Sequence, residues 1–450
     1  KVAPQAAFDP ETMKLHLQTA NTLLERLLAD SHAPCALPVL KHSKRVKSGA
    51  RGIGLPLLRA IRSFYASHNA LDKTMEQVCK EEGFGASVCT LTASTGLSLA
   101  ESVVIAGERA GVDASALVGP AGAFFSYSWT GTTLGDMLQA VRSALHRLKA
   151  EGEPMPFVWI DMFCASQNLL GGVYRDDANH PKGSPGYKAR KEDTDHIFDD
   201  ALAAVSVVIF YLSPLEGEWQ APPHAYLADD RGEPPAGWIR HGPNAVTRAW
   251  CLFELATALA AGKRLLVELA PADRARLRDI LETDPWSLDQ TLADIDAADA
   301  QISKVEDREY ILPRVHEAGG FHGVNRQVKA ALRDWLAETG RELLRTAEAE
   351  EGTGALGLQF GLAGLLENQA KYDEAEGLYR RSLASEEVVY GPAHPNTLAT
   401  VGNLATLLKN QGKYDEAEPL YRRALKGFEE ALGPAHPDTL MSVGNLANML

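Results

Sequence analysis

The stretch KYDEAEGLYRRSL at residues 371–383 returns as KYDEAEPLYRRAL at residues 413–425. His394 likewise returns as His436, so the features recur after 42 residues, as from 371 to 413. A fixed period in this range predicts a solenoid of stacked units, each of which buries its apolar face only against its neighbours. Such an array leaves a concave surface for partners.

Each unit has the pattern of two helices joined by a short break. We expect Asn396 to cap the first helix and Gln411-Gly412 to end it. Gly433, which a proline follows, should end the second helix. The apolar positions at helical spacing are Leu398, Val401, Leu404, Ala405, Leu407 and Leu408 in the first helix and Tyr414, Ala417, Leu420, Tyr421, Ala424, Leu425 and Phe428 in the second.

This pattern resembles the tetratricopeptide repeat, in the longer form found in kinesin light chains, over about residues 355–450. The resemblance implies an α-solenoid that binds proteins or peptides. A kinesin-light-chain-like cargo adaptor is one interpretation, but it leaves residues 1–340 unexplained. Because the chain begins at Lys1 and ends at Leu450, inside the first helix of a third unit, we expect it to be a piece of a longer protein with further repeats.

Composition narrows the class of protein. The formal net charge of −14, from 45 basic and 59 acidic residues, argues against nonspecific binding to nucleic acid. Five scattered cysteines without a CxxC pair indicate reduced thiols and a cytoplasmic location. The longest apolar run, at 203–212, is too short to cross a bilayer, so no membrane partner is expected. A chain of 450 residues predicts two or three domains.

Residues 118–270 alternate between strands and helices. Continuous apolar strands separated by helices predict a parallel sheet covered on both faces. In such sheets ligands bind at the carboxyl ends of the strands, where Ser126, Ser128 and Asp161 would lie. The predicted strands are 123–128, 157–161, 205–212 and 264–269, and the predicted helices include 134–148, 194–204 and 247–261.

Three segments of this region resemble a Toll/interleukin receptor (TIR) domain. They are FSYS at 125–128, the helix and strand at 195–214, and RAWCLFEL at 248–255, which is similar to a segment of plant TIR domains. The resemblance implies a flavodoxin-like parallel sheet that self-associates. In catalytic members of the family, the glutamate of the last motif, here Glu254, is required to cleave the nicotinamide–ribose bond of NAD. Other members are adaptors without activity.

The chemistry of such a site can be argued from the residues. Trp250 and Glu254 are four residues apart and share one helix face. Cleavage of a glycosidic bond passes through an oxocarbenium-like state, which a nearby carboxylate stabilises. Because nicotinamide in NAD is already a cationic leaving group, one carboxylate can suffice, and neither a metal nor another cofactor is expected.

Each accompanying residue has a structural alternative. Trp250 either stacks on the nicotinamide ring or packs in the core, and Arg248 either binds the pyrophosphate or is solvated. Ser126, Ser128 and Asp161 either contact the substrate or form local hydrogen bonds at strand ends and in a loop. Two long insertions, at 164–190 and 216–243, would form a lid over the site or block it.

The remaining segments carry no functional motif. Residues 1–117 are predicted to be mainly helical, and residues 271–340 a helical extension or linker. Two main hypotheses follow: a signalling scaffold whose TIR-like domain hydrolyses NAD, or an adaptor that only binds proteins. A Glu254 carboxyl that points into an open cleft would favour the first.

Overall fold

The computed structural model divides the chain into two compact units, residues 1–270 with 296–328, and residues 271–295 with 329–450. The predicted insertions at 164–190 and 216–243 lie largely outside the residues described, and the predicted boundaries at 117, 270 and 340 stay predictions. The structure describes residues 10–30, 51–80, 87–92, 98–128, 131–165, 197–213, 215, 218–220, 226–228, 239–241, 243–302, 306–350 and 354–449.

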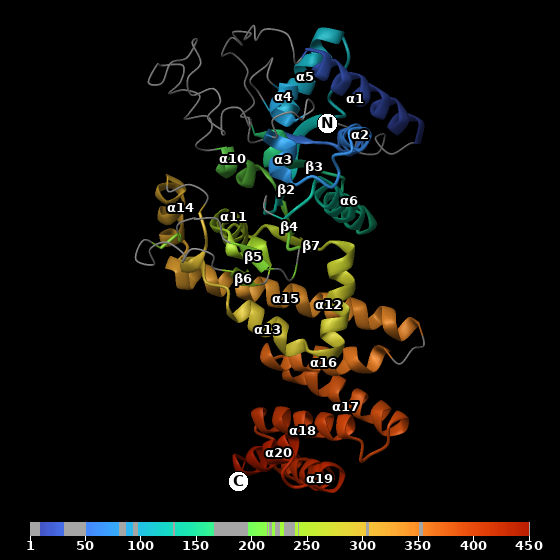
Figure 1. Ribbon diagram of the computed structural model, residues 1–450, viewed down its shortest axis with the longest axis vertical. Coiled ribbons are helices and arrows are strands. Elements are labelled where there is room, and N and C mark those ends of the chain that lie inside the picture. Colours follow the sequence, from blue (N-terminus) through green and yellow to red (C-terminus); the bar gives the residue numbers. More distant parts are fainter. Residues whose placement is uncertain are drawn as a thin grey trace. The chain divides into compact units, whose positions relative to one another are not determined.

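The first unit is built on a mixed five-stranded sheet with the order β1-β3-β2-β4-β7 (Figure 1). Strand β2 runs parallel to both β3 and β4, and β4 runs parallel to β7, which confirms the predicted parallel strands. Strand β1 is antiparallel to its neighbours. The bounds are β1 Arg51–Ile53, β2 Val118–Ser126, β3 Phe157–Ile160, β4 Val207–Tyr211 and β7 Arg264–Glu268.

Strand β1 was not predicted, because three residues are too few for a periodic signal. Its pairing explains why β2 begins earlier than predicted, since Ile53 pairs with Val118 and Arg51 with Pro120. Gly52 is required for this close approach. A Cβ atom there would lie 2.8 Å from the carbonyl carbon of Phe157, closer than real Cβ atoms come.

Helices surround this sheet, and the apolar strands therefore lie in one continuous core. Every residue of β4 is buried, and Phe124 of β2 stacks on Trp159 of β3 with ring centroids 4.8 Å apart. The helices are α1 Pro10–Asp30, α2 Leu55–Ser67, α3 Met75–Lys80, α4 Val88–Thr92, α5 Leu99–Ala110, α6 Leu134–Ala150, α7 Asp161–Cys164, α10 Ile197–Ala204, α11 Ala249–Ala260 and α14 Glu306–Glu317. Two further strands, β5 Glu218–Gln220 and β6 Ile239–His241, form a separate two-stranded sheet.

The second unit is a stack of helices, in agreement with the predicted solenoid (Figure 1). It includes residues 329–349 of the long helix α15 Gly320–Ala349. Its other helices are α12 Pro271–Thr283, α13 Pro285–Ala293, α16 Gly354–Asn368, α17 Tyr372–Val389, α18 Pro395–Asn410, α19 Tyr414–Leu432 and α20 Pro437–Ala447.

The cap of the repeated first helix differs from the prediction. His394 rather than Asn396 is the capping residue, and its side chain accepts a hydrogen bond from the backbone N–H of Asn396. Pro395 is the first helical residue, since its fixed φ suits the first turn and it has no N–H to satisfy. His436 caps α20 in the same way.

Candidate functional site

Polar side chains meet at the carboxyl edge of the sheet in the first unit. Ser126, the last residue of β2, donates a hydrogen bond of 2.6 Å from Oγ to Oε2 of Glu254 on α11. The hydroxyl of Tyr127 donates one of 2.6 Å to Oδ1 of Asp161, which begins α7 after β3. Nδ2 of Asn244 donates to Oγ of Ser128 at 2.9 Å. The structure thus brings Ser126, Ser128, Asp161 and Glu254 to one edge.

Helix α11 carries Glu254 into the protein because it is apolar on nearly all sides. Cys251, Leu252, Phe253 and Leu255 are buried around it, and Glu254 itself is only 6% exposed. A helix that is apolar all round packs on more than one face. The carboxyl group is therefore enclosed rather than presented at an open cleft.

This burial decides the charge of the carboxyl group. Burial raises the pKa of Glu254 to about 8; the hydrogen bond from Ser126 opposes the rise, and the charge of Asp161 adds to it. Near neutral pH, Glu254 is therefore mainly protonated. Burial, followed by the charge of Asp161, also raises the pKa of Tyr127, so this phenol stays neutral and donates its hydrogen bond.

Trp250 and Arg248 have different surroundings. The indole ring of Trp250 lies in an aromatic cluster, with ring centroids 5.0 Å from Phe198, 5.3 Å from Tyr310 and 5.9 Å from Phe253. Arg248 is half-buried just before α11, and burial lowers the pKa of its guanidinium. The contacts of Trp250 are those of a residue that packs against other aromatic side chains. The proposed contacts of Trp250 and Arg248 with NAD stay predictions.

Asn244 was not predicted as part of this edge. It begins the short 3-10 helix η5 Asn244–Thr247 and is buried, with its side chain on Ser128. Thr247 donates from Oγ1 to the backbone carbonyl of Asn244 at 2.8 Å and holds this turn. A single polar residue in an irregular segment has no periodic signal, so only the tertiary structure identifies it.

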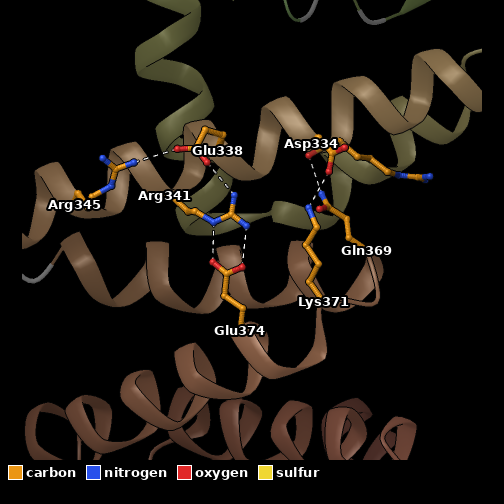
Figure 2. A network of polar contacts seen from close by, with 8 residues as sticks. Asp334, Glu338, Arg341, Arg345, Gln369, Lys371 and Glu374 are labelled. Carbon is orange, nitrogen blue, oxygen red and sulfur yellow. Dashed lines mark hydrogen bonds and ion pairs between the residues drawn. The ribbon is translucent and has the colours of Figure 1, made fainter. Parts of the chain in front are cut away.

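A second polar cluster joins α15 to α17 in the second unit, as Figure 2 shows. The guanidinium of Arg341 donates two hydrogen bonds to the carboxylate of Glu374, at 2.7 and 2.8 Å, and a third to Glu338 at 3.1 Å. Nζ of Lys371 binds Oδ1 of Asp334 at 2.8 Å. A bidentate contact of this kind sets orientation as well as distance.

The contact between Lys371 and Asp334 recurs one period later. Lys413 binds Glu376 at 2.8 Å, and both residues lie 42 positions beyond the first pair, as from 371 to 413 and from 334 to 376. Small residues recur with the same spacing at Gly340, Ser382 and Ala424, all of them close to a neighbouring helix or buried. Residues 329–349 of α15 therefore occupy the place of a second helix in an earlier unit, which the sequence analysis did not predict.

One face of α16 packs closely on α12 and α13. The face carries three glycines, and a Cβ on Gly361 would lie 1.8 Å from the backbone oxygen of Leu281, whereas Cβ atoms on Gly357 and Gly364 would lie 3.0 Å from the Glu282 oxygen and 3.2 Å from Trp286. The same positions on α18, one period later, are Ala399, Asn403 and Thr406, which are half-buried. Helices α12 and α13 thus cover on α16 a face that stays partly exposed on α18.

The helices from α16 to α20 match a protein-family model. The model of the tetratricopeptide repeat family matches residues 355–430 and 399–450, so the C-terminal part of the chain consists of tetratricopeptide repeats. This match does not extend to residues 118–270, and the TIR resemblance of that region stays a prediction. No curated protein matches the chain.

The solved structures that match part of the chain include one described as a putative kinesin light chain. The crystal structure of BtubC (BKLC) from P. vanneervenii is 17% identical, with a TM-score of 0.26 over 40% of this chain and 63% of that chain. Two structures of a Podosopora anserina putative kinesin light chain with nearly identical TPR-like repeats, one of them a point variant, are 18% and 19% identical. Both have a TM-score of 0.25, over 45% of this chain and 85% and 86% of theirs. This chain therefore spans less than two thirds of BtubC, and the similarity specifies no function.

Within the described residues, no group of three or more histidine, cysteine, aspartate or glutamate side chains is arranged to hold a metal ion. None of the described helices combines the length and the apolar character needed to cross a membrane. Cys79, Cys164 and Cys251 are buried and form no disulfide with another of the described residues.

Proposed function

We propose that the chain is a scaffold whose repeats bind a protein or peptide partner, and that the binding surface begins at α18. The main support for this is the partly exposed face that Ala399, Asn403 and Thr406 form on α18. The corresponding face of α16 is covered by α12 and α13. Stacked helical repeats present such faces side by side along one surface. An extended peptide would therefore meet α18 and the repeat that follows it.

Contacts behind this face support it as a rigid surface. The hydroxyl of Tyr421 on α19 donates to Oγ1 of Thr406 at 2.9 Å, and Nδ2 of Asn410 donates to Glu367 on α16 at 3.1 Å. The opposite side of α18 packs Leu398 and Val401 against α19. A surface fixed in this way loses little conformational entropy when a partner binds.

A display experiment tests the scaffold proposal. The purified chain is used to select binders from a library of random peptides, and the selected peptides are measured against an Ala399→Arg/Asn403→Arg variant. We expect the binding of the selected peptides to fall roughly tenfold or more, since both substitutions place long charged side chains on the face. Lys426→Arg is the matched control, because residue 426 is exposed on α19 and this substitution keeps the positive charge there. Selected peptides that bind both chains equally would contradict the proposal.

We propose as a second function that the carboxyl edge of the sheet cleaves NAD. The strand order supports this: β2, the first parallel strand, lies between the next two, β3 and β4, and β7 follows β4. This order is compatible with a flavodoxin-like sheet, in which ligands bind at the carboxyl ends of the strands on either side of the first. Glu254 and its partner Ser126 lie at that edge.

The proposed reaction breaks the bond between C1′ of the ribose and the nicotinamide nitrogen. Nicotinamide leaves with the electron pair, the oxygen of water bonds to C1′, and the proton of that water goes to solvent, which leaves ADP-ribose. For the Glu254 carboxylate to stabilise the cationic sugar and orient its hydroxyls, this enclosed side chain would have to become accessible to the substrate. This role requires the ionised form, and because the pKa of Glu254 is about 8, activity should rise as pH increases through about 8.

Nicotinamide release measures this function directly. The assay uses the whole chain, free and tethered to a surface so that self-association through the TIR-like unit is favoured, beside Glu254→Gln. Glu153→Gln is the matched control, because Glu153 is an exposed glutamate. We expect release in the wild type and the control and its loss in Glu254→Gln. If neither the free nor the tethered chain releases nicotinamide, the remaining function of this unit is that of an adaptor without catalytic activity.

A further inference from the structure

A groove with an apolar floor and a basic rim runs between α1, α2 and α6 in the first unit. Two adjoining cavities form it, of about 590 and 270 Å³, and both are lined by Leu55 and Arg59. We call it the basic groove. Its floor consists of Met13, Leu17, Leu55, Leu58, Leu138 and Met155, and its rim consists of the basic residues Arg59, Arg62, Arg142, His146 and Lys149.

The rim residues form two rows at helical spacing. Arg59 and Arg62 lie three residues apart on α2, while Arg142, His146 and Lys149 lie four and three apart on α6. Side chains at these spacings lie on one face of a helix. Each row therefore presents its charges along one side of the groove.

The lining of the basic groove contributes no negative charge. No acidic side chain is among the described residues that line the two cavities, and all five rim residues are exposed. Arg59, Arg62 and Arg142 form no ion pair with the residues that the structure describes. Elsewhere the chain pairs such arginines, as Arg341 with Glu374 (Figure 2). A single-sign rim in a chain of net charge −14 is a local exception.

We propose that the basic groove binds an acidic amphipathic helix of a partner protein. From Leu138 to Lys149, α6 rises about 17 Å, which matches roughly three turns of a bound helix. An apolar stripe on that helix would contact the floor, and carboxylates three or four residues apart would meet the two cationic rows. Met13 and Met155 suit this role, because flexible thioether side chains adapt to varied apolar surfaces.

The apolar floor favours this occupant over a nucleic acid. A nucleic acid has no apolar stripe to cover six floor side chains, and its binding depends on neutralising many phosphates. A peptide helix supplies both the apolar stripe and the localised carboxylates.

The basic groove is independent of the proposed NAD site and of the repeats. Glu151, directly after α6, pairs with Arg264 at the start of β7, so this end of α6 lies at the amino edge of the sheet. Glu254 lies at the carboxyl edge. Loss of binding in the groove would therefore leave nicotinamide release, and the binding of peptides to the face on α18, unchanged.

The test uses the whole chain and a labelled synthetic helix with leucines on one face and glutamates on both flanks. Fluorescence anisotropy compares the wild type with Arg62→Glu/Arg142→Glu. We expect the double substitution to weaken binding roughly tenfold or more, and added salt to weaken wild-type binding, since the charges are exposed. Arg326→Glu on α15 is the matched control, because Arg326 is also exposed, and it should leave binding within about twofold.

Counter-probes define the outcomes that would overturn the proposal. A peptide with lysine in place of glutamate and a shuffled peptide of the same composition should not bind. No measurable binding of the acidic helix, equal binding of the shuffled peptide, or no effect of the double substitution would each overturn it. So would binding of phosphatidylglycerol vesicles, or self-association of the chain, through the same arginines in place of the helix. Arg62→Gln/Arg142→Gln, checked by circular dichroism, excludes a folding defect as the cause of lost binding.

Discussion

Two glutamates show that the two units use a carboxyl group in opposite ways. Glu254 is enclosed in the first unit, and burial raises its pKa to about 8. Glu376 lies near the surface of the repeats, where the hydrogen bond from Lys413 lowers its pKa to about 2; burial opposes this effect, and the hydrogen bond from Arg380 adds to it. The first group is suited to chemistry or to a binding event that changes its charge, and the second to joining helices.

The difference also decides how each group affects stability as pH changes. A carboxyl whose pKa is raised on folding contributes stability below its unfolded pKa that is lost as pH rises toward its folded pKa. A carboxyl whose pKa is lowered contributes stability above its unfolded pKa that is lost as pH falls. The stability that Glu254 contributes is therefore lost as pH rises from about 4.5 to 8. The stability that Glu376 contributes is lost as pH falls from about 4.5 to 2.

The largest effect should come from Glu254→Gln. Glutamine can accept the hydrogen bond from Ser126 without a buried charge, so the free energy of unfolding above about pH 8 should rise by roughly 3–5 kcal/mol, an order-of-magnitude value from the pKa shift. Denaturant unfolding at about pH 5 and pH 8.5 measures it. The same difference between wild type and variant at both pH values would show that the pKa of Glu254 is not raised on folding.

Gly361→Ala tests the closest packing of the second unit. The added Cβ would meet the backbone oxygen of Leu281 at 1.8 Å, and we expect a loss of about 2–4 kcal/mol in the free energy of unfolding. Gly377→Ala is the control, because nothing lies within 4 Å of its Cβ position on α17, and it should be stabilised by about 0.5–1 kcal/mol. Equal effects at the two positions would contradict the packing of α12 on α16.

Glu376→Gln should have a smaller effect. The side chain of Glu376 is 16% exposed, and solvent screening reduces the contribution expected from its lowered pKa to about 1 kcal/mol at neutral pH. The loss should vanish as pH falls toward about 2, because the wild-type carboxyl is then protonated as well. Thermal unfolding at about pH 7 and pH 2.5 distinguishes this from a loss of packing, which would persist in acid.

The smallest effect concerns the pair that joins α15 to α17. A double-mutant cycle with Arg341→Ala and Glu374→Ala should give a coupling of about 0.5–1 kcal/mol, since the bidentate contact is partly exposed, and high salt should reduce it. A coupling of zero would show that this pair does not help to hold residues 329–349 against α17.

The extent of sequence-based prediction follows the same division. The spacing of apolar residues located the helices of the repeats and the apolar strands, because each of these elements needs apolar side chains at regular positions along its buried side. It missed β1, which is only Arg51–Ile53, and the role of α15, whose Asp334 takes the place of Glu376 without the surrounding motif. It also assigned the cap to Asn396 rather than His394, since the proline between them shifts the start of the helix.

The sequence by itself determined the 42-residue repeats, the parallel strands and the placement of Ser126, Ser128 and Asp161 at strand ends, because local spacing and strand direction are sufficient for these. Only the tertiary structure decided that Glu254 is enclosed with a raised pKa, since that depends on helix α11 being packed into the core. It alone also placed Arg62 and Arg142 along one groove. Their helices are distant in sequence, and no periodic pattern records which helix faces meet.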